Sequence, residues 1–292
     1  MFKVHARYLH FLNRTIKSSI KLPEYALNPS YSYPFPEKTE KFTQKDIDKI
    51  RTVSKIVAEC LESLSHFIKP GITTDKIDDF VFNFAMDKNV YPTPLGFKGF
   101  PRSCVTSVNE IICHGIPSAR ILMDGDIISV DVSFYKNGFH GDSCKSYLVG
   151  ADIENHPKKN LIKHAYDCSL AGVDAVQCGK PYLQVGKAIS QKAIDNGVRI
   201  AYGICGHGLG SYLHGPPQIG HTIYDCQDGV FEENSVFTIE PCIVEGNGKD
   251  FVTNHKCLED RWSLITGDGA CGSQFEHVVL VLRDSIEILS KL

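Results

Sequence analysis

The stretch that decides the fold is DIISVDVSFYKNGFHGDSCKSYLVG, which runs from Asp126 to Gly150. Apolar residues alternate with small and polar ones on both sides of Asn137-Gly138, a residue pair that strongly favours a two-residue type I′ turn. The pattern therefore predicts a long β-hairpin with its turn at Asn137-Gly138. A turn of this length also fixes the register of the two strands.

Two carboxylates of this hairpin share one face. The register places Asp131 opposite Cys144 and Ser133 opposite Asp142, so Asp131 and Asp142 are diagonal neighbours with Cβ atoms about 7–8 Å apart. A β-bulge at Gly141 would modify this pairing. Carboxylates that close repel each other, and burial penalises their charge further. A solvated face would explain a lone aspartate pair, but the surrounding apolar alternation predicts partial burial. A shared proton or a cation must then compensate for the repulsion and for the lost solvation.

Further metal-ligand candidates lie in the second half of the chain. Glu240 in VFTIEP and Glu276 in QFEHVVLVL each lie inside a strongly β-forming run, although glutamate is rarely buried without a partner. The segment GICGHGLGSYLHGPPQIGH, residues 203–221, has the composition of a loop and contains His207 and His214. Four carboxylates with one imidazole suit Mn, Co, Fe or Zn, and their charge exceeds that of one divalent ion. The residues thus favour two metals and leave open which histidine binds them.

Helical patterns occur twice, in the same order. Thr43 and Asp46 form a capping-box-like start, and apolar residues then recur at three- and four-residue steps up to Ile68. A Lys-Pro turn and a helix over about residues 74–88 follow. Helices over residues 160–176 and 183–197, again separated by a Lys-Pro turn, repeat the pattern. A strand-rich tract follows each pair of helices, which predicts two similar lobes with a site between them.

Composition limits the class of protein. The chain has 292 residues, 42% hydrophobic and 22% charged, with a net charge of −3. This is a globular balance that gives no basis for nucleic-acid binding, and no apolar run approaches the ~20 residues that a membrane span needs. The eleven cysteines are scattered and form no C-x-x-C pair. That argues against a zinc finger or a disulfide framework and favours a reducing compartment.

The N-terminus differs from the rest. No acidic residue precedes Glu24, whereas five lysines and arginines do, and on a helical wheel they lie apart from the apolar residues. This pattern is typical of a mitochondrial transit peptide; a membrane-surface helix and an ordinary tail are the alternatives. The Pro-, Ser- and Tyr-rich segment that follows is typical of an extended linker. We therefore expect a transit peptide and linker over residues 1–40 and a globular domain over residues 41–292.

Five segments together resemble one protein family. SVNEIICHGIP, DGDIISVDVSFYKNGFHGDS, GHGLGSYLHGPPQI, FTIEP and SQFEHVV occur in the order of the motif blocks of type 1 methionine aminopeptidases. The resemblance runs from about residue 43 to the C-terminus and is greatest to the mitochondrial form. It implies an α+β pita-bread fold with two pseudo-two-fold related halves, and a metallo-aminopeptidase catalytic domain over residues 41–292. Its activity would be removal of N-terminal methionine from nascent or newly made proteins, with a preference for a small second residue.

The resemblance also implies how two divalent ions per subunit would be held. Asp131 would chelate one ion, Asp142 and Glu276 would bridge both, and His207 and Glu240 would complete the shell of the other. The ions, of Co, Mn, Fe or Zn, would activate a water for attack on the first peptide bond. Glu240 would also carry a proton from this water to the leaving amine.

The remaining candidates are implied to contact substrate. His114 would hydrogen-bond near the scissile amide, and His214 would stabilise the oxyanion rather than bind metal. The methionine pocket would have His114 at its edge and would be lined by Phe97, Phe100, Val105, Leu213 and Trp262. An aromatic lining suits a thioether, although core packing would explain the two phenylalanines taken alone. Many family members have His-Glu-Glu-Pro where this chain has His-Gly-Pro-Pro from His214, but the replaced acids are not expected ligands, so activity should persist.

Partners, location and rival functions follow from the resemblance together with the composition. Peptides with an N-terminal methionine and nascent proteins are the expected substrates, with the ribosome as a further partner, and a monomer is expected. No direct nucleic-acid or membrane binding is expected, and the expected location is the mitochondrion, with the cytoplasm as the alternative. A proline-specific pita-bread peptidase is one rival function, but such enzymes are usually longer. A non-catalytic pita-bread binding protein is another, but such relatives lose the metal ligands.

Overall fold

The hairpin predicted around Asn137-Gly138 forms the centre of the first half of the molecule. The computed structural model describes residues 14–28, 30–150, 155–246 and 249–291. In it, β4 (Ile127–Lys136) and β5 (Phe139–Leu148) are joined by a two-residue turn. Asn137 and Gly138 have φ values of 53° and 94°, and positive φ at both positions is what a type I′ turn requires.

The register of this hairpin is the predicted one. Asp131 pairs with Cys144 and Ser133 with Asp142, and the pairing continues without a bulge. Gly141 is required for a different reason. A Cβ at this position would come within 2.7 Å of the backbone nitrogen of Ser54, so glycine allows a helix to pack directly on the hairpin.

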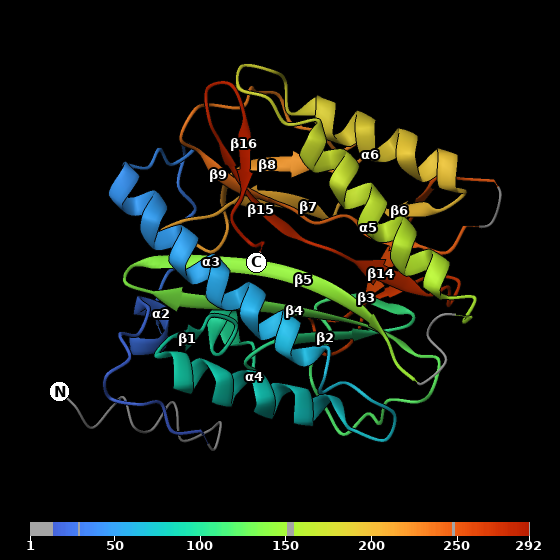
Figure 1. Ribbon diagram of the computed structural model, residues 1–292, viewed down its shortest axis with the longest axis horizontal. Coiled ribbons are helices and arrows are strands. Elements are labelled where there is room, and N and C mark those ends of the chain that lie inside the picture. The colour runs from blue at the N-terminus through green and yellow to red at the C-terminus, as the bar shows by residue number, and fades with distance from the viewer. Residues whose placement is uncertain (1–13, 29, 151–154, 247–248, 292) are drawn as a thin grey trace.

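That helix begins where the capping pattern predicts. In α3 (Gln44–Leu64), the Thr43 side chain accepts a hydrogen bond from the backbone N–H of Asp46. The next helix, α4 (Thr74–Lys88), has the predicted bounds and ends at Asn89 in the left-handed conformation. Figure 1 shows α3 lying across β4 and β5, with α4 below them.

The second half repeats this arrangement. Helices α5 (Lys159–Asp174) and α6 (Leu183–Asn196) lie within two residues of the predicted bounds, and Gly197 ends α6 with a φ of 65°. They cover strands of the second half as α3 covers the hairpin (Figure 1). Each half has its own large hydrophobic core cluster. The sequence repeat therefore corresponds to two structural halves.

Four sheets connect these elements. In the first half, β4 pairs with β5 and also with β1 (Tyr91–Pro92) and β2 (Val105–Val108). A five-stranded sheet of the second half has the order β16 (Ile286–Ile288), β15 (His277–Val281), β9 (Val236–Ile239), β7 (Cys205–Gly208) and β8 (Gly215–Gly220). A four-stranded sheet has the order β11 (Val252–Thr253), β6 (Arg199–Ala201), β10 (Cys242–Val244) and β14 (Gly272–Gln274). The last sheet contains β12 (His255–Cys257), β13 (Leu264–Thr266) and β3 (Ile111–Cys113).

Two predicted strands are interrupted at their acidic residues. Glu240 lies between β9 and β10, and Glu276 lies between β14 and β15, so neither is inside a strand as the sequence pattern suggested. Between β9 and β10 the chain passes from the five-stranded sheet to the sheet that contains β10 and β14, and between β14 and β15 it passes back. Because β9 pairs with β15 and β10 pairs with β14, the two breaks lie side by side. Pro241, which has no N–H to donate to a sheet, favours the break after Glu240.

The glycine- and proline-rich segment is not the loop that its composition indicated. It forms β7 and β8, with only residues 209–214 between them. The glycines allow close approach of neighbouring strands: a Cβ on Gly206 would lie 2.0 Å from the carbonyl oxygen of Thr238, and one on Gly208 would lie 2.0 Å from that of Pro216. The two prolines lie on β8, an edge strand of its sheet, where a missing N–H is tolerated.

Part of the N-terminal segment packs on the domain. Residues 1–13 of the expected transit peptide lie outside the described residues, and residues 14–21 are not helical. Ile20, Tyr25 and Ala26 are buried in the first core cluster, and α2 (Glu24–Leu27) is a single helical turn. Tyr31 and Tyr33 of the expected linker are partly buried against the same cluster.

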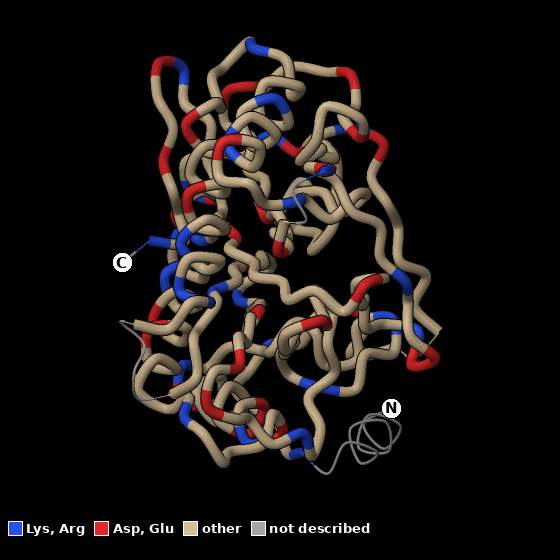
Figure 2. The backbone as a smooth tube through the Cα atoms, turned by 90° about the vertical axis from the view of Figure 1, so that its right-hand side faces the viewer, with Lys and Arg blue, Asp and Glu red and all other residues tan. Residues whose placement is uncertain are grey.

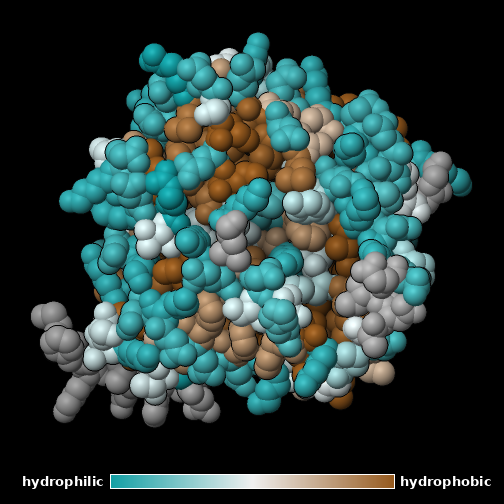
Figure 3. All heavy atoms as spheres, viewed as in Figure 1, coloured by the Kyte–Doolittle hydropathy of each residue, from teal (hydrophilic) through white to brown (hydrophobic). Residues whose placement is uncertain are grey.

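Charge and hydropathy are distributed as in an ordinary globular protein. Figure 2 shows lysine and arginine interspersed with aspartate and glutamate over both halves. On the face seen in Figure 3, hydrophilic residues cover most of the surface and hydrophobic ones gather over the strands of the five-stranded sheet, where the helices leave it less covered. No helix of the described residues has the length and apolar character needed to cross a bilayer.

Candidate metal centre

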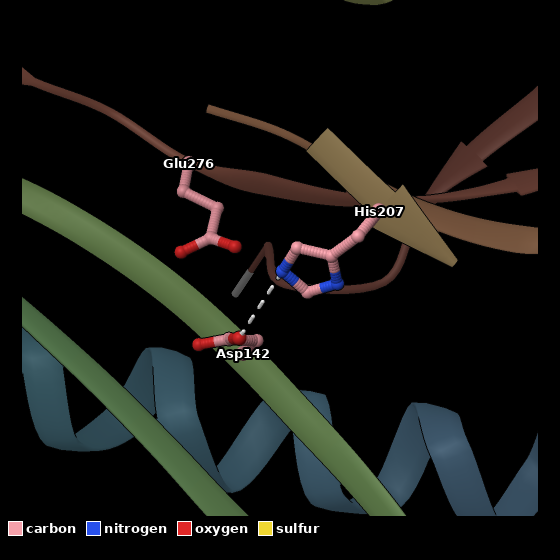
Figure 4. Close-up of side chains that lie close together, drawn as sticks. All are labelled: Asp142, His207 and Glu276. Carbon is pink, nitrogen blue, oxygen red and sulfur yellow. Dashed lines mark ion pairs between the residues drawn. The ribbon is translucent and has the colours of Figure 1, made fainter. Parts of the chain in front are cut away.

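Three residues from separate elements converge between the two halves. Asp142 comes from β5, His207 from β7, and Glu276 from the break between β14 and β15. Their potential ligand atoms all lie within 4.8 Å of one another. Figure 4 shows the three side chains pointing toward a common centre, with a dashed line between His207 Nε2 and Asp142 Oδ2, which are 4.0 Å apart. All three residues are buried.

The other two expected ligands adjoin this group. Glu240 Oε1 lies 3.3 Å from His207 Nε2. Asp131 lies beside Asp142 on the hairpin, and burial, followed by the neighbouring Asp142, raises the pKa of its carboxyl well above the ordinary value. The structure therefore brings together all five residues that the sequence nominated as ligands.

Among the described residues, no lysine or arginine forms an ion pair with these carboxylates, and the positive charge near them is that of His114, which lowers the pKa of Asp142 and Glu240. Within the described part of the chain, Asp131 Oδ1, Asp142 Oδ1 and Glu276 Oε1 are buried and lack a hydrogen-bond partner. Burial raises the pKa of Asp142 to about 6, and it also raises the pKa of Glu240 and Glu276 well above the ordinary value. Buried acids without partners are strongly unfavourable, whereas a divalent cation would neutralise them. The residues present thus fit divalent metal ions.

His207 presents the ring nitrogen that such a site needs. Its Nδ1 lies 3.3 Å from the carbonyl oxygen of Gly208. Because a carbonyl only accepts hydrogen bonds, Nδ1 carries the hydrogen and the lone pair of Nε2 faces Asp142 and Glu240. Burial lowers the pKa of His207 to about 4, so the ring is neutral at neutral pH. A neutral imidazole is the form that binds metal.

Sequence reasoning missed three residues that hold Glu240. Thr238 Oγ1 donates to Glu240 Oε1 at 2.8 Å, and Gln274 Nε2 donates to the Glu240 carbonyl oxygen at 3.0 Å. The Glu240 N–H donates to His221 Nε2 at 3.1 Å, while His221 Nδ1 lies 2.9 Å from the Ile204 carbonyl oxygen. Alternation along β9 could have indicated Thr238, but no pattern in the sequence indicated His221 or Gln274.

The aromatic residues expected to contact substrate form two groups. The rings of His214 and His207 are 4.3 Å apart, and Phe97 lies edge-on to His214 at 5.4 Å. Trp262 contacts Phe100 at 5.0 Å and His114 at 6.3 Å. These distances place His214 and Phe97 beside the ligand residue His207, and they gather Phe100 and His114 around Trp262.

Two expected pocket residues, Val105 and Leu213, lie on β2 and in the loop that carries His214, and the two expected substrate histidines differ in protonation. Val105 pairs directly with Asp131 across β2 and β4, so both side chains share one face. Leu213 is buried in the loop before His214. Burial lowers the pKa of His214 well below its ordinary value, whereas the neighbouring Cys113 raises the pKa of His114 to about 9. His214 is therefore a neutral hydrogen-bonding group and His114 a cationic one.

Comparison with known proteins identifies the family. Residues 48–283 match the family model described as metallopeptidase family M24. The chain is 37% identical over 286 residues to the human protein named methionine aminopeptidase 1D, mitochondrial, which covers 96% of this chain and 83% of that protein. The chain belongs to the methionine aminopeptidases of family M24.

Solved structures agree with this assignment. The crystal structure of methionine aminopeptidase from Rickettsia prowazekii has a TM-score of 0.79 at 33% identity, covering 87% of this chain and 100% of that one. Prolidase from Pyrococcus furiosus has a TM-score of 0.64 at 19% identity, covering 86% of this chain and 65% of that one, and so shares the fold. The predicted α+β pita-bread fold and the metallopeptidase class of this aminopeptidase are thus confirmed. Membership of this family implies divalent metal ions.

Proposed function

We propose that this chain removes the N-terminal methionine from peptides and newly made proteins, with a preference for a small second residue. The observation that carries the proposal is the convergence of buried carboxylates, three of which have an oxygen without a hydrogen-bond partner among the described residues, with a neutral imidazole. The name of the human relative supports the same activity.

We further propose that two divalent ions occupy this site. The residues that would hold them are Asp131, Asp142, His207, Glu240 and Glu276. Four carboxylates exceed the charge of one divalent ion, which supports a pair. When bound, the ions would supply Lewis acidity and lower the pKa of water.

The protein's own residues would move protons and hold the substrate. Glu240 has one carboxylate oxygen fixed by Thr238, and burial raises its pKa, so it is suited to accept a proton and pass it to the leaving amine. Neutral His214 would donate a hydrogen bond to the carbonyl oxygen of the cleaved bond. His114, next to Trp262, would hold the amide. The apolar rings of Phe100 and Trp262 would receive the methionine side chain.

Peptide hydrolysis with defined metals tests this function. We expect the purified chain to release methionine from Met-Ala-Ser when Mn or Co is added, and to lose this activity in a chelator. Ala-Ala-Ser and Ala-Pro serve as controls for a general aminopeptidase and for a proline-specific peptidase. Stoichiometric metal binding without turnover of any peptide that begins with methionine would contradict the proposal.

The cellular setting is a separate proposal. The relative's name and the basic N-terminal composition support a mitochondrial location. Because Arg14 pairs with the buried Asp78, and Ile20 and Tyr25 belong to the core, we propose that a removable leader would end before Arg14. A reporter fused to residues 1–40 should enter mitochondria, and a diffuse cytosolic signal would refute this. Ribosome binding and a monomeric state stay predictions.

A further inference from the structure

A cavity of about 370 Å³ adjoins the metal centre on the side of His214. One wall is the N-terminal strap, which we define as residues 21–28 and 30–35. The opposite wall is formed by Phe97 and Lys98, by Tyr135 and His140 of the hairpin, and by residues 211–214. The volume lies within the range of about 300–1,000 Å³ that ligand pockets span.

The strap is fixed to the domain as part of this site. The Tyr25 hydroxyl donates to the Thr93 carbonyl oxygen at 2.5 Å. Tyr33 accepts from the Lys98 N–H at 2.6 Å and donates to the Gly96 carbonyl oxygen at 3.3 Å. The rings of both tyrosines also pack edge-on against Phe97, at 5.4 and 5.0 Å. The strap therefore holds Phe97, the residue that contacts His214.

The cavity and the methionine pocket lie next to different groups of the site. Phe100, Trp262 and His114 form the group expected to receive the first residue of the substrate. None of these three lines the cavity, whereas His214 does, together with Phe97 and Leu213, the two expected pocket residues that border it. If His214 donates to the carbonyl of the cleaved bond, the residues after that bond extend past His214. The cavity that His214 lines would then receive them.

We propose that the cavity is a binding subsite for the third and fourth residues of the substrate, and that it prefers apolar side chains there. This inference rests on the proposed function. The lining supports the preference, because aromatic and aliphatic side chains of the strap dominate it and the strap's charged residues there are Lys21 and Glu24, of opposite sign. Substrate specificity would then extend beyond the second residue.

Tetrapeptides that differ only at these positions test the subsite. We expect kcat/KM for Met-Ala-Leu-Phe to exceed that for Met-Ala-Gly-Gly by roughly tenfold, as burial of one or two apolar groups allows. The variant Leu27→Ala/Phe35→Ala removes two apolar side chains of the wall. Both are exposed, at 39% and 58%, so the variant should fold. It should lose the preference through a higher KM for Met-Ala-Leu-Phe.

The control is Tyr224→Ala, which removes an exposed aromatic side chain that packs against Phe251, away from the cavity. It should retain the wild-type preference. Equal kcat/KM for the two tetrapeptides in the wild type, or a preference that survives in the double variant, overturns the subsite. If the wild type cleaves neither tetrapeptide nor Met-Ala-Ser, the proposed function itself fails and the subsite falls with it.

Discussion

Asp142 stands where both halves of the molecule meet, and its carboxylate has one oxygen without a partner. The change Asp142→Asn keeps the shape of the side chain and removes its charge. We expect loss of activity by at least about 100-fold and loss of tight metal binding, because a charged oxygen that would hold metal is replaced by a neutral amide. Activity assays and calorimetric metal titration measure the two effects.

The same variant should be more stable than the wild type in a chelator. Without metal, the neutral amide that replaces the Asp142 carboxylate would relieve like-charge repulsion with Asp131 and Glu276, so the Tm of the metal-free form should rise by a few degrees. Asp195→Asn, on the exposed face of α6, is the matched control and should change neither property. An Asp142→Asn protein that keeps its activity would remove this residue from the site.

Residues of the site differ in how far the sequence could predict them. Asp131 and Asp142 could be paired because a two-residue turn fixes the register of a hairpin. The contacts of Glu240 with His221 and Gln274 join residues 19 and 34 positions apart. They depend on how two sheets meet at the chain breaks, which no local pattern encodes.

At the scale of elements, the loop between β7 and β8 carries His214, and a residue that belongs to no strand of the sheet, Glu40, holds this loop. Glu40 accepts hydrogen bonds from the Ser211 N–H, at 3.0 Å, and from the Ser211 hydroxyl. We expect Glu40→Ala to free this loop and lower kcat for Met-Ala-Ser about three- to tenfold, because His214 would be less well positioned. Steady-state kinetics measure the effect.

Glu37→Ala is the control for this prediction, since Glu37 is exposed in the same segment. Glu40→Gln, which can still accept from Ser211, should restore most of the activity. If Glu40→Ala and Glu37→Ala have equal kcat, the loop does not depend on Glu40.

A second contact between elements has a predictable pH dependence. Arg51 of α3 binds Glu287 of β16 through two parallel hydrogen bonds of 2.7 and 2.8 Å, and these lower the pKa of Glu287 below its ordinary value. A lowered carboxyl pKa contributes stability above the unfolded-state pKa, and this contribution is lost as the pH falls through the folded-state pKa. Because both groups are more than one-third exposed, the contribution should be about 1 kcal/mol or less.

Glu287→Gln tests the direction of this pH dependence of stability. Its free energy of unfolding should be lower than that of the wild type at pH 7, and the two should converge below about pH 4, where Glu287 becomes protonated. Urea denaturation at several pH values measures the difference. A difference that stays constant from pH 7 to pH 3 would show that the ion pair is not its cause.

Elements with strong periodicity could be predicted, and those that depend on close packing could not. The four long helices follow from apolar spacing and from caps such as Thr43. Strands β7 and β8 contradict the propensity of their glycines and prolines. They exist because neighbouring strands approach so closely that only glycine fits at Gly206 and Gly208.

At the scale of the whole molecule, an ion pair ties the start of the described chain to the core. Arg14 pairs with Asp78, whose side chain is only 1% exposed, and its guanidinium lies 4.6 Å from the centre of the Phe82 ring. Composition alone indicated that Arg14 belonged to a removable basic leader. A buried acid elsewhere in the chain, which composition does not reveal, makes it part of the fold.

Removal of Arg14 should therefore destabilise the protein. We expect Arg14→Met, which keeps the apolar stem, to lower the free energy of unfolding by about 2–4 kcal/mol, because Asp78 would lose its closest cation inside the core. Asp78→Asn in the same background should recover part of this loss, since it removes the unpaired charge. Urea denaturation measures both changes.

Lys17→Met is the control. Lys17 pairs with the exposed Asp87 and is itself 49% exposed, so this change should lower the free energy of unfolding by about 0.5 kcal/mol or less. Equal stability of Arg14→Met and Lys17→Met would mean that Arg14 is dispensable, and a leader could then extend past it.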